Sequence, residues 1–212
     1  MIINDDWTFV HIPRTGGVSL KIAYLESLGV EQYVHYHKNP YECQHMLRPV
    51  FAGMHNEPPM NTFGSEHALV NHWEQWIPEN SQLFTIVRNP YDRFQSICRR
   101  GYDISLTDED RANSLDVDYV LSHEGWQSWK AADTQKSYLD STTKPITVYK
   151  FETQLQSAYE DHNLVFADRE SEPSGIQNNA SQNQTDILTP ENIEKINTHF
   201  HDDFVEFGYT KL

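Results

Sequence analysis

Short apolar runs alternate with segments of helical periodicity along this chain. Apolar runs at residues 7–12, 82–87 and 145–151 (WTFVHI, QLFTIV and PITVYKF) predict three strands. Apolar positions 18, 22, 25 and 28 predict a helix over 18–28, and residues 91–102 and those from 152 onward also have helical character. The order strand, helix, strand, helix is typical of a parallel sheet with helices on its faces.

The remaining segments complete this picture. Residues 32–36 have the composition of a further strand, and residues 66–76 look helical. Apolar positions 193, 196, 200, 204 and 207 predict one closing amphipathic helix over 190–207. Residues 38–63 read as irregular structure and residues 168–186 as a polar loop. Because neither a repeat nor a linker separates two cores, we expect one α/β domain over residues 1–212.

The first strand leads directly into a turn with two adjacent glycines, in the stretch HIPRTGGVSL (residues 11–20). A strand, a glycine-containing turn and a helix N-terminus together form a cradle for phosphate, because backbone N–H groups and the helix dipole attract an anion. Arg14 adds a full charge, and Thr15 and Ser19 add hydroxyl donors. The kinase-type P-loop pattern GxxxxGK[ST] is not met, and an ordinary tight turn with a capping hydroxyl is the alternative interpretation.

A second basic motif, VRNPYDRFQS (residues 87–96), follows the strand at residues 82–87. Arg88 stands at the end of this strand, where open α/β sheets bind their ligands. Ser96 lies eight residues further on, about two helical turns, so the two side chains can grip one anion. The alternatives are a surface salt bridge for Arg88 and a solvated hydroxyl for Ser96.

The negative net charge of the chain makes Arg14 and Arg88 in these motifs more informative. With 16 Lys and Arg against 31 Asp and Glu, the chain carries a formal net charge of −15, which disfavours nucleic acid and anionic membranes as partners. An anion must therefore be held by a few locally placed cations.

The two cysteines, Cys43 and Cys98, lack metal-site spacing and are expected to be reduced thiols. With no membrane-length apolar run and no signal-peptide pattern, we expect a cytoplasmic protein.

Both motifs resemble those of sulfotransferases that use 3′-phosphoadenosine 5′-phosphosulfate (PAPS). HIPRTGGVSL is similar to the 5′-phosphosulfate loop, and LFTIVRNPYDRFQS to the 3′-phosphate motif, of the carbohydrate branch that includes heparan sulfate 2-O-sulfotransferases and small bacterial homologues. VYKFETQL and the ending FHDDFVEFGY agree with the same family in order. The resemblance implies a P-loop NTPase-like three-layer fold, with a central parallel sheet flanked by helices.

The resemblance also implies roles for individual residues. Residues Arg14, Thr15, Gly16, Gly17, Val18 and Ser19 would line the 5′-phosphosulfate, and Arg88 and Ser96 would hold the 3′-phosphate. Arg14 replaces the lysine usual in the family, and Val18 a common threonine. An arginine neutralises the leaving group but is a poor proton donor, so its role is electrostatic and turnover is expected to be lower. The acceptor would be a hydroxyl of a carbohydrate or small molecule, and no metal would be required.

Transfer to a hydroxyl needs a base, for which the chain offers several histidines. His67, 21 residues before Arg88, resembles the family's catalytic histidine in context. His55, in FAGMHNEPP, is the second candidate, and the pair His35 and His37 is the third. His11 is assigned to packing of the loop. No histidine pair has the spacing of a zinc site.

Three further charged residues near these motifs have structural interpretations. Asp92 and Arg93 are interpreted as a pair within their own helix, and Glu152 as a residue that fixes a loop. Two other functions stay open at this point. One is a nucleotide or small-molecule kinase with an atypical P-loop, which would need Mg²⁺. The other is a non-catalytic module that binds PAPS or its product, adenosine 3′,5′-bisphosphate.

Overall fold

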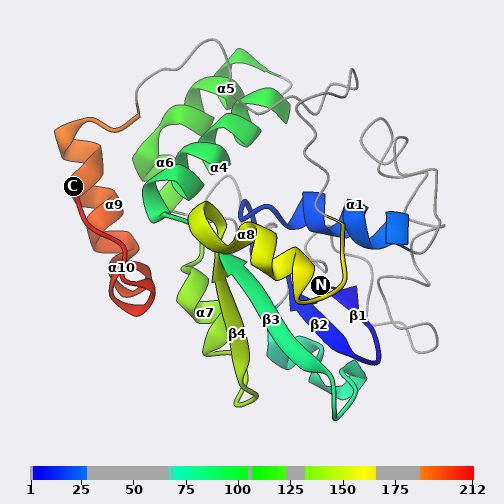
Figure 1. The fold of residues 1–212 in the computed structure, drawn as a ribbon. Coiled ribbons are helices and arrows are strands. Elements are labelled where there is room, and N and C mark those ends of the chain that lie inside the picture. The colour runs from blue at the N-terminus through cyan, green and yellow to red at the C-terminus, as the bar shows by residue number, and fades with distance from the viewer. Residues whose placement is uncertain (1, 28–66, 68, 105–106, 123–131, 166–186) are drawn as a thin grey trace.

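The computed structural model describes residues 2–27, 67, 69–104, 107–122, 132–165 and 187–212 (Figure 1). The predictions for residues 32–36, 38–63 and 168–186 lie outside this described part, as do Cys43, His35, His37 and His55. In the described part the chain is α/β, with a four-stranded mixed sheet flanked by helices. None of the helices described is long and apolar enough to cross a membrane.

The sheet has the order β1-β2-β3-β4. Strands β2, β3 and β4 run parallel, whereas β1 pairs antiparallel with β2 through Ile2 with Phe9 and Ile3 with Thr8. The predicted parallel sheet is present in β2, β3 and β4. The strand β1 adds an antiparallel edge, because the turn at residues 4–6 is too short for the crossover that a parallel pair needs. The strands are β1 (Ile2–Ile3), β2 (Trp7–Val10), β3 (Gln82–Val87) and β4 (Ile146–Lys150).

A helix follows each parallel strand, as the hydrophobic pattern predicts. These helices are α1 (Gly17–Ser27), α4 (Pro90–Ile104) and α8 (Phe151–Glu160). Between them lie α5 (Asp108–Leu115), α6 (Val117–Leu121) and α7 (Gln135–Leu139), and the described part closes with α9 (Pro190–His199) and α10 (His201–Phe207).

Two predicted helices differ in detail. Residues 66–76 were expected to be helical, but the structure has the 3₁₀ turns η3 (Val70–His72) and η4 (Glu74–Trp76). Val70, Trp73 and Ile77 still bury one apolar face, so the periodicity was real and the backbone satisfies it with tighter turns. The single helix expected over 190–207 is broken at Phe200, whose ψ of 25° is not helical and separates α9 from α10.

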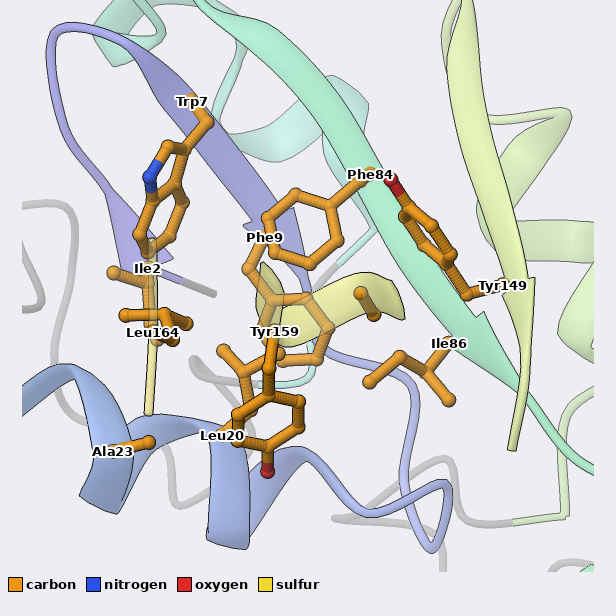
Figure 2. Close-up of a cluster of buried hydrophobic side chains, with 11 residues drawn as sticks. Ile2, Trp7, Phe9, Leu20, Ala23, Phe84, Ile86, Tyr149, Tyr159 and Leu164 are labelled. Carbon is orange, nitrogen blue, oxygen red and sulfur yellow. The ribbon is translucent and has the colours of Figure 1, made fainter. Parts of the chain in front are cut away.

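Alternating side chains of the strands supply a core on each face of the sheet. On one face Trp7, Phe9 and Phe84 pack with Leu20 of α1 and Tyr159 of α8 (Figure 2). On the other face Val10, Leu83 and Val87 pack with Val70, Trp73, Tyr138 and Phe207 from η3, the η3–η4 junction, α7 and α10. A third cluster joins α4, α6, α9 and α10, and includes Phe94, Val120, Ile196, Phe200 and Phe204. Cys98 of α4 is a buried free thiol, and burial raises its pKa to about 12.

Candidate functional site

The three parallel strands end at one edge of the sheet, where the predicted motifs begin. Val10 is paired with Thr85, and Val87 with Lys150, so the residues that follow β2, β3 and β4 emerge side by side. These are the β2–α1 loop (residues 11–16), Arg88, and Phe151 at the start of α8. Open α/β sheets bind ligands at this edge, so the fold brings both predicted phosphate motifs to the expected place.

The β2–α1 loop has an unusual backbone that depends on both glycines. Arg14 and Gly16 adopt φ of 67° and 90°, in the left-handed region that favours glycine. At Gly17 an added Cβ would lie 2.0 Å from the His11 ring, so only glycine leaves room for that histidine. The strain at Arg14 is of order 1 kcal/mol, and non-glycine residues in this conformation concentrate at functional sites.

A hydrogen bond joins the two motifs. Arg14 Nε donates to Ser96 Oγ at 3.0 Å, although the residues are 82 positions apart in the chain. Ser96 lies in α4 and is buried. Since its oxygen accepts from Arg14, the hydroxyl hydrogen of Ser96 can be donated elsewhere, for instance to an anion. No hydrogen bond joins Arg88 to Ser96 among the residues described, and the printed side-chain partner of Ser96 is Arg14. Whether Arg88 and Ser96 hold one anion, as their spacing predicts, stays a prediction.

The guanidinium of Arg88 forms no salt bridge with the residues that the structure describes. Its Nε atom is buried with no hydrogen-bond partner in the described part of the chain, and its Cζ lies 4.8 Å from the centroid of the Phe151 ring. Desolvation lowers the pKa of Arg88, opposed by the carboxylates of Asp92 and Glu152. An arginine keeps its charge at neutral pH despite such a shift. Arg88 is therefore a partly desolvated cation with hydrogen-bonding capacity to spare.

Glu152 fixes the loop beyond Arg88, as the sequence interpretation had it. Its Oε1 accepts from the backbone N–H of Asn89 at 2.6 Å, and its Oε2 accepts from the Tyr209 hydroxyl at 2.9 Å. Asn89 Oδ1 in turn accepts from the N–H of Tyr91 at 3.0 Å in the first turn of α4. The start of α4 is thereby held beside the ends of β3 and β4.

His67 lies against the β2–α1 loop. Its Nδ1 is 3.2 Å from the carbonyl oxygen of His11, and the two imidazole rings are 4.2 Å apart between centroids. A carbonyl only accepts hydrogen bonds, so Nδ1 carries the proton and the lone pair of the neutral ring is on Nε2. This hydrogen bond therefore favours the Nδ1–H tautomer of His67. His11 is buried within the loop.

The other residues predicted to line the 5′-phosphosulfate differ in whether their side chains are exposed and can donate a hydrogen bond to a ligand. The Thr15 hydroxyl donates to the carbonyl oxygen of Ile12 at 2.9 Å, so its hydrogen is used to close the turn. Ser19 is exposed and Val18 is half-buried in the first turn of α1. Thr15 therefore contributes loop shape in this structure, and its hydroxyl hydrogen is not directed outward.

Sequence reasoning missed a buried polar network beneath the site. Gln135 Oε1 accepts from Arg88 N at 2.8 Å while its Nε2 donates to Arg88 O at 2.9 Å, as a neighbouring strand would. Asp203 of α10 accepts from the backbone N–H groups of Gln135 and Lys136, each at 2.9 Å. Gln135 and Asp203 are fully buried. No local pattern in the sequence signals these contacts, which join segments 47 and 68 residues apart.

Arg93 lies within electrostatic range of Asp203, and its contacts correct one interpretation. Instead of pairing with the exposed Asp92, the completely buried Arg93 donates from Nε to Pro13 O at 3.0 Å and from Nη1 to Asp133 O at 2.9 Å. Desolvation lowers its pKa, opposed by Asp203. Arg93 thus fastens the β2–α1 loop to α4 and to the segment before α7. The position of an arginine in the sequence of a helix does not by itself tell whether its side chain is buried or exposed.

No family model, curated protein or solved structure matches this chain. The site is therefore interpreted from the residues that form it.

Proposed function

We propose that this protein is a sulfotransferase that moves the sulfuryl group of PAPS to a hydroxyl, on a carbohydrate or a small molecule. The observation that carries the proposal is the hydrogen bond from Arg14 to Ser96, which unites two loops whose sequences each resemble a PAPS-binding motif. The buried Arg88 Nε without a partner among the described residues supports it, since an anionic ligand would satisfy that donor.

The site residues divide the chemistry between them. The loop at Gly16 and Gly17 and the N-terminus of α1 receive the 5′-phosphosulfate, while Arg88 receives the 3′-phosphate, with Ser96 as a hydroxyl donor. The acceptor oxygen attacks sulfur in line, and the sulfur–oxygen bond to the 5′-phosphate breaks. Adenosine 3′,5′-bisphosphate leaves with the bond's electron pair, and the guanidinium of Arg14 stabilises this charge without giving up a proton.

His67 takes the proton of the attacking hydroxyl. The carbonyl of His11 holds its Nδ1–H and leaves Nε2 as the basic atom. An orienting acceptor on the far nitrogen is the arrangement by which general-base histidines keep one tautomer. His55, which lies outside the described residues, is the second candidate for this role.

Titration with adenosine 3′,5′-bisphosphate tests the proposal. We expect binding, measured by calorimetry and by a rise in melting temperature, and weaker binding of 5′-AMP, which lacks the 3′-phosphate. Transfer of labelled sulfate from PAPS to a panel of hydroxyl acceptors should then continue in the presence of EDTA. A protein that ignores adenosine 3′,5′-bisphosphate contradicts the proposal, and ATP-dependent transfer abolished by EDTA would identify a kinase instead.

A further inference from the structure

Phe151 lies between the two anion-binding loops and contacts both. A Cβ added to Gly16 would lie 2.8 Å from Cε2 and 3.0 Å from Cδ2 of the Phe151 ring, so the ring packs directly on the backbone of the glycine loop. The Arg88 guanidinium carbon lies 4.8 Å from the centroid of the same ring. Phe151 itself is anchored, because it opens α8 directly after β4 and packs, partly buried, against the core between the sheet and α1.

The Phe151 ring is a cation–π neighbour of the Arg88 guanidinium. Among the described residues the Arg88 side chain makes no hydrogen bond, and its Nε is buried. A guanidinium at the end of a flexible stem samples many positions unless something restrains it. The aromatic face attracts the cation and also excludes water from one side of it.

We propose that Phe151 is a specificity-determining residue, whose ring sets the position of the Arg88 guanidinium relative to the glycine loop. The inference rests on the function proposed above. A nucleotide with phosphate groups on both its 5′ and 3′ positions uses the two loops at once, so it gains from their fixed separation. A 5′-monophosphate uses the glycine loop alone and gains nothing from a restrained Arg88.

The test compares two ligands on three variants. The quantity measured is the ratio of the Kd of 5′-AMP to the Kd of adenosine 3′,5′-bisphosphate. Phe151→Leu keeps an apolar side chain beside Gly16 and removes the aromatic face, and we expect it to lower this ratio about tenfold, with 5′-AMP binding little changed. Phe151→Tyr retains the face and should retain the ratio.

Leu155→Ala is the matched control, because Leu155 approaches the same loop, with Cδ1 4.0 Å from the position of a Gly16 Cβ, from one turn further along α8. It should lower the melting temperature and leave the ratio unchanged. Unaltered 5′-AMP binding by the leucine variant shows that its loop is folded.

The outcomes separate the two proposals. A wild-type protein that does not bind adenosine 3′,5′-bisphosphate overturns both. A wild-type protein that binds it, with a ratio that Phe151→Leu leaves intact, overturns the role of Phe151 alone. Equal losses for both ligands, or the same fall in the ratio for Leu155→Ala, also overturn that role, because they indicate general damage to the loop.

Discussion

The side-chain amide of Gln135 takes the place of a strand beside Arg88. It donates to the Arg88 carbonyl and accepts from the Arg88 N–H, at 2.9 and 2.8 Å, just beyond the last pair of β3 and β4. The backbone of Arg88 is thereby fixed after the sheet itself has ended. The Arg88 side chain therefore projects from a backbone that Gln135 of α7 fixes, and Asp203 of α10 holds Gln135 in turn.

Gln135→Leu should therefore destabilise the fold by about 2–4 kcal/mol, because it leaves two backbone groups of Arg88 unsatisfied. Urea denaturation measures the change in free energy of unfolding. The exposed Gln156, bonded to Glu160 on the surface of α8, provides the control, and Gln156→Leu should stay within about 0.5 kcal/mol of the wild type. Equal effects of the two substitutions would contradict the role assigned to Gln135.

Gly17→Ala tests the close approach of His11 to the loop. The added methyl group would overlap the His11 ring, and because that ring lies 4.2 Å from the His67 ring, both histidines are displaced. We expect a loss of about 1–3 kcal/mol in stability. His11→Ala should relieve part of it, so that the double variant is more stable than the sum of the single effects predicts, by at least about 0.5 kcal/mol. Simple additivity would show that the two positions do not interact.

Two substitutions of Arg14 separate the effect of its backbone strain on stability from the effect of its charge on activity. Arg14→Gly and Arg14→Ala both remove the bond to Ser96, but only alanine retains a Cβ at a φ of 67°. The glycine variant should be more stable than the alanine variant by about 1 kcal/mol. Both should lose sulfuryl transfer, since both lack the cation. Thermal unfolding measures the stability of each variant, and an activity assay measures sulfuryl transfer. An alanine variant more stable than the glycine variant would contradict the inferred backbone strain at Arg14.

His67→Gln separates proton transfer from binding. Glutamine can still donate to the His11 carbonyl, but it cannot accept a proton from the acceptor hydroxyl. We expect kcat to fall by about 10²–10⁴, while the Kd of adenosine 3′,5′-bisphosphate is unchanged. The exposed His72, in η3, is the control position, at which glutamine should alter neither quantity. Full turnover in His67→Gln would move the role of base to another residue, with His55 the next candidate.

His162 gives the fold a dependence on pH. Its ring stacks on Phe84 at 3.6 Å between centroids, and its Nε2 is buried without a partner among the described residues. Burial lowers the pKa of His162 below its ordinary value of 6.5, opposed by Asp161. The unfolded chain therefore takes up a proton at His162 more readily than the folded protein does. The contribution of the neutral His162 ring to stability is present above pH 6.5 and is lost as the pH falls toward the folded pKa.

His162→Phe removes this titration and keeps an aromatic ring beside Phe84. We expect the free energy of unfolding to decline less steeply than in the wild type between about pH 7 and pH 5. Urea denaturation across that range measures the slope. A variant that keeps the full slope would show that His162 is protonated equally in both states.

Local patterns predicted the parts of the site that depend on local structure. The strand over residues 82–87 was predicted with its observed ends, and the loop with the twin glycines follows β2 as expected. Arg88 directly follows the last residue of this strand, because the apolar run that predicted the strand ends at Val87. By contrast Gln135, Asp203 and Arg93 act across long sequence separations, and their residue types are more often exposed. Tertiary packing alone decides their positions, which a linear pattern does not contain.

The two residues of β1 have a consequence for how copies of this chain behave in solution. Without them, β2 would present its backbone N–H and carbonyl groups as an open border of the sheet. Ile2 pairs with Phe9 and Ile3 with Thr8, and these pairs cover that part of the border from within the same molecule. In the described part of the sheet, the edge on this side is then β1, which is only two residues long, and so short an edge offers a strand of another molecule little backbone with which to pair.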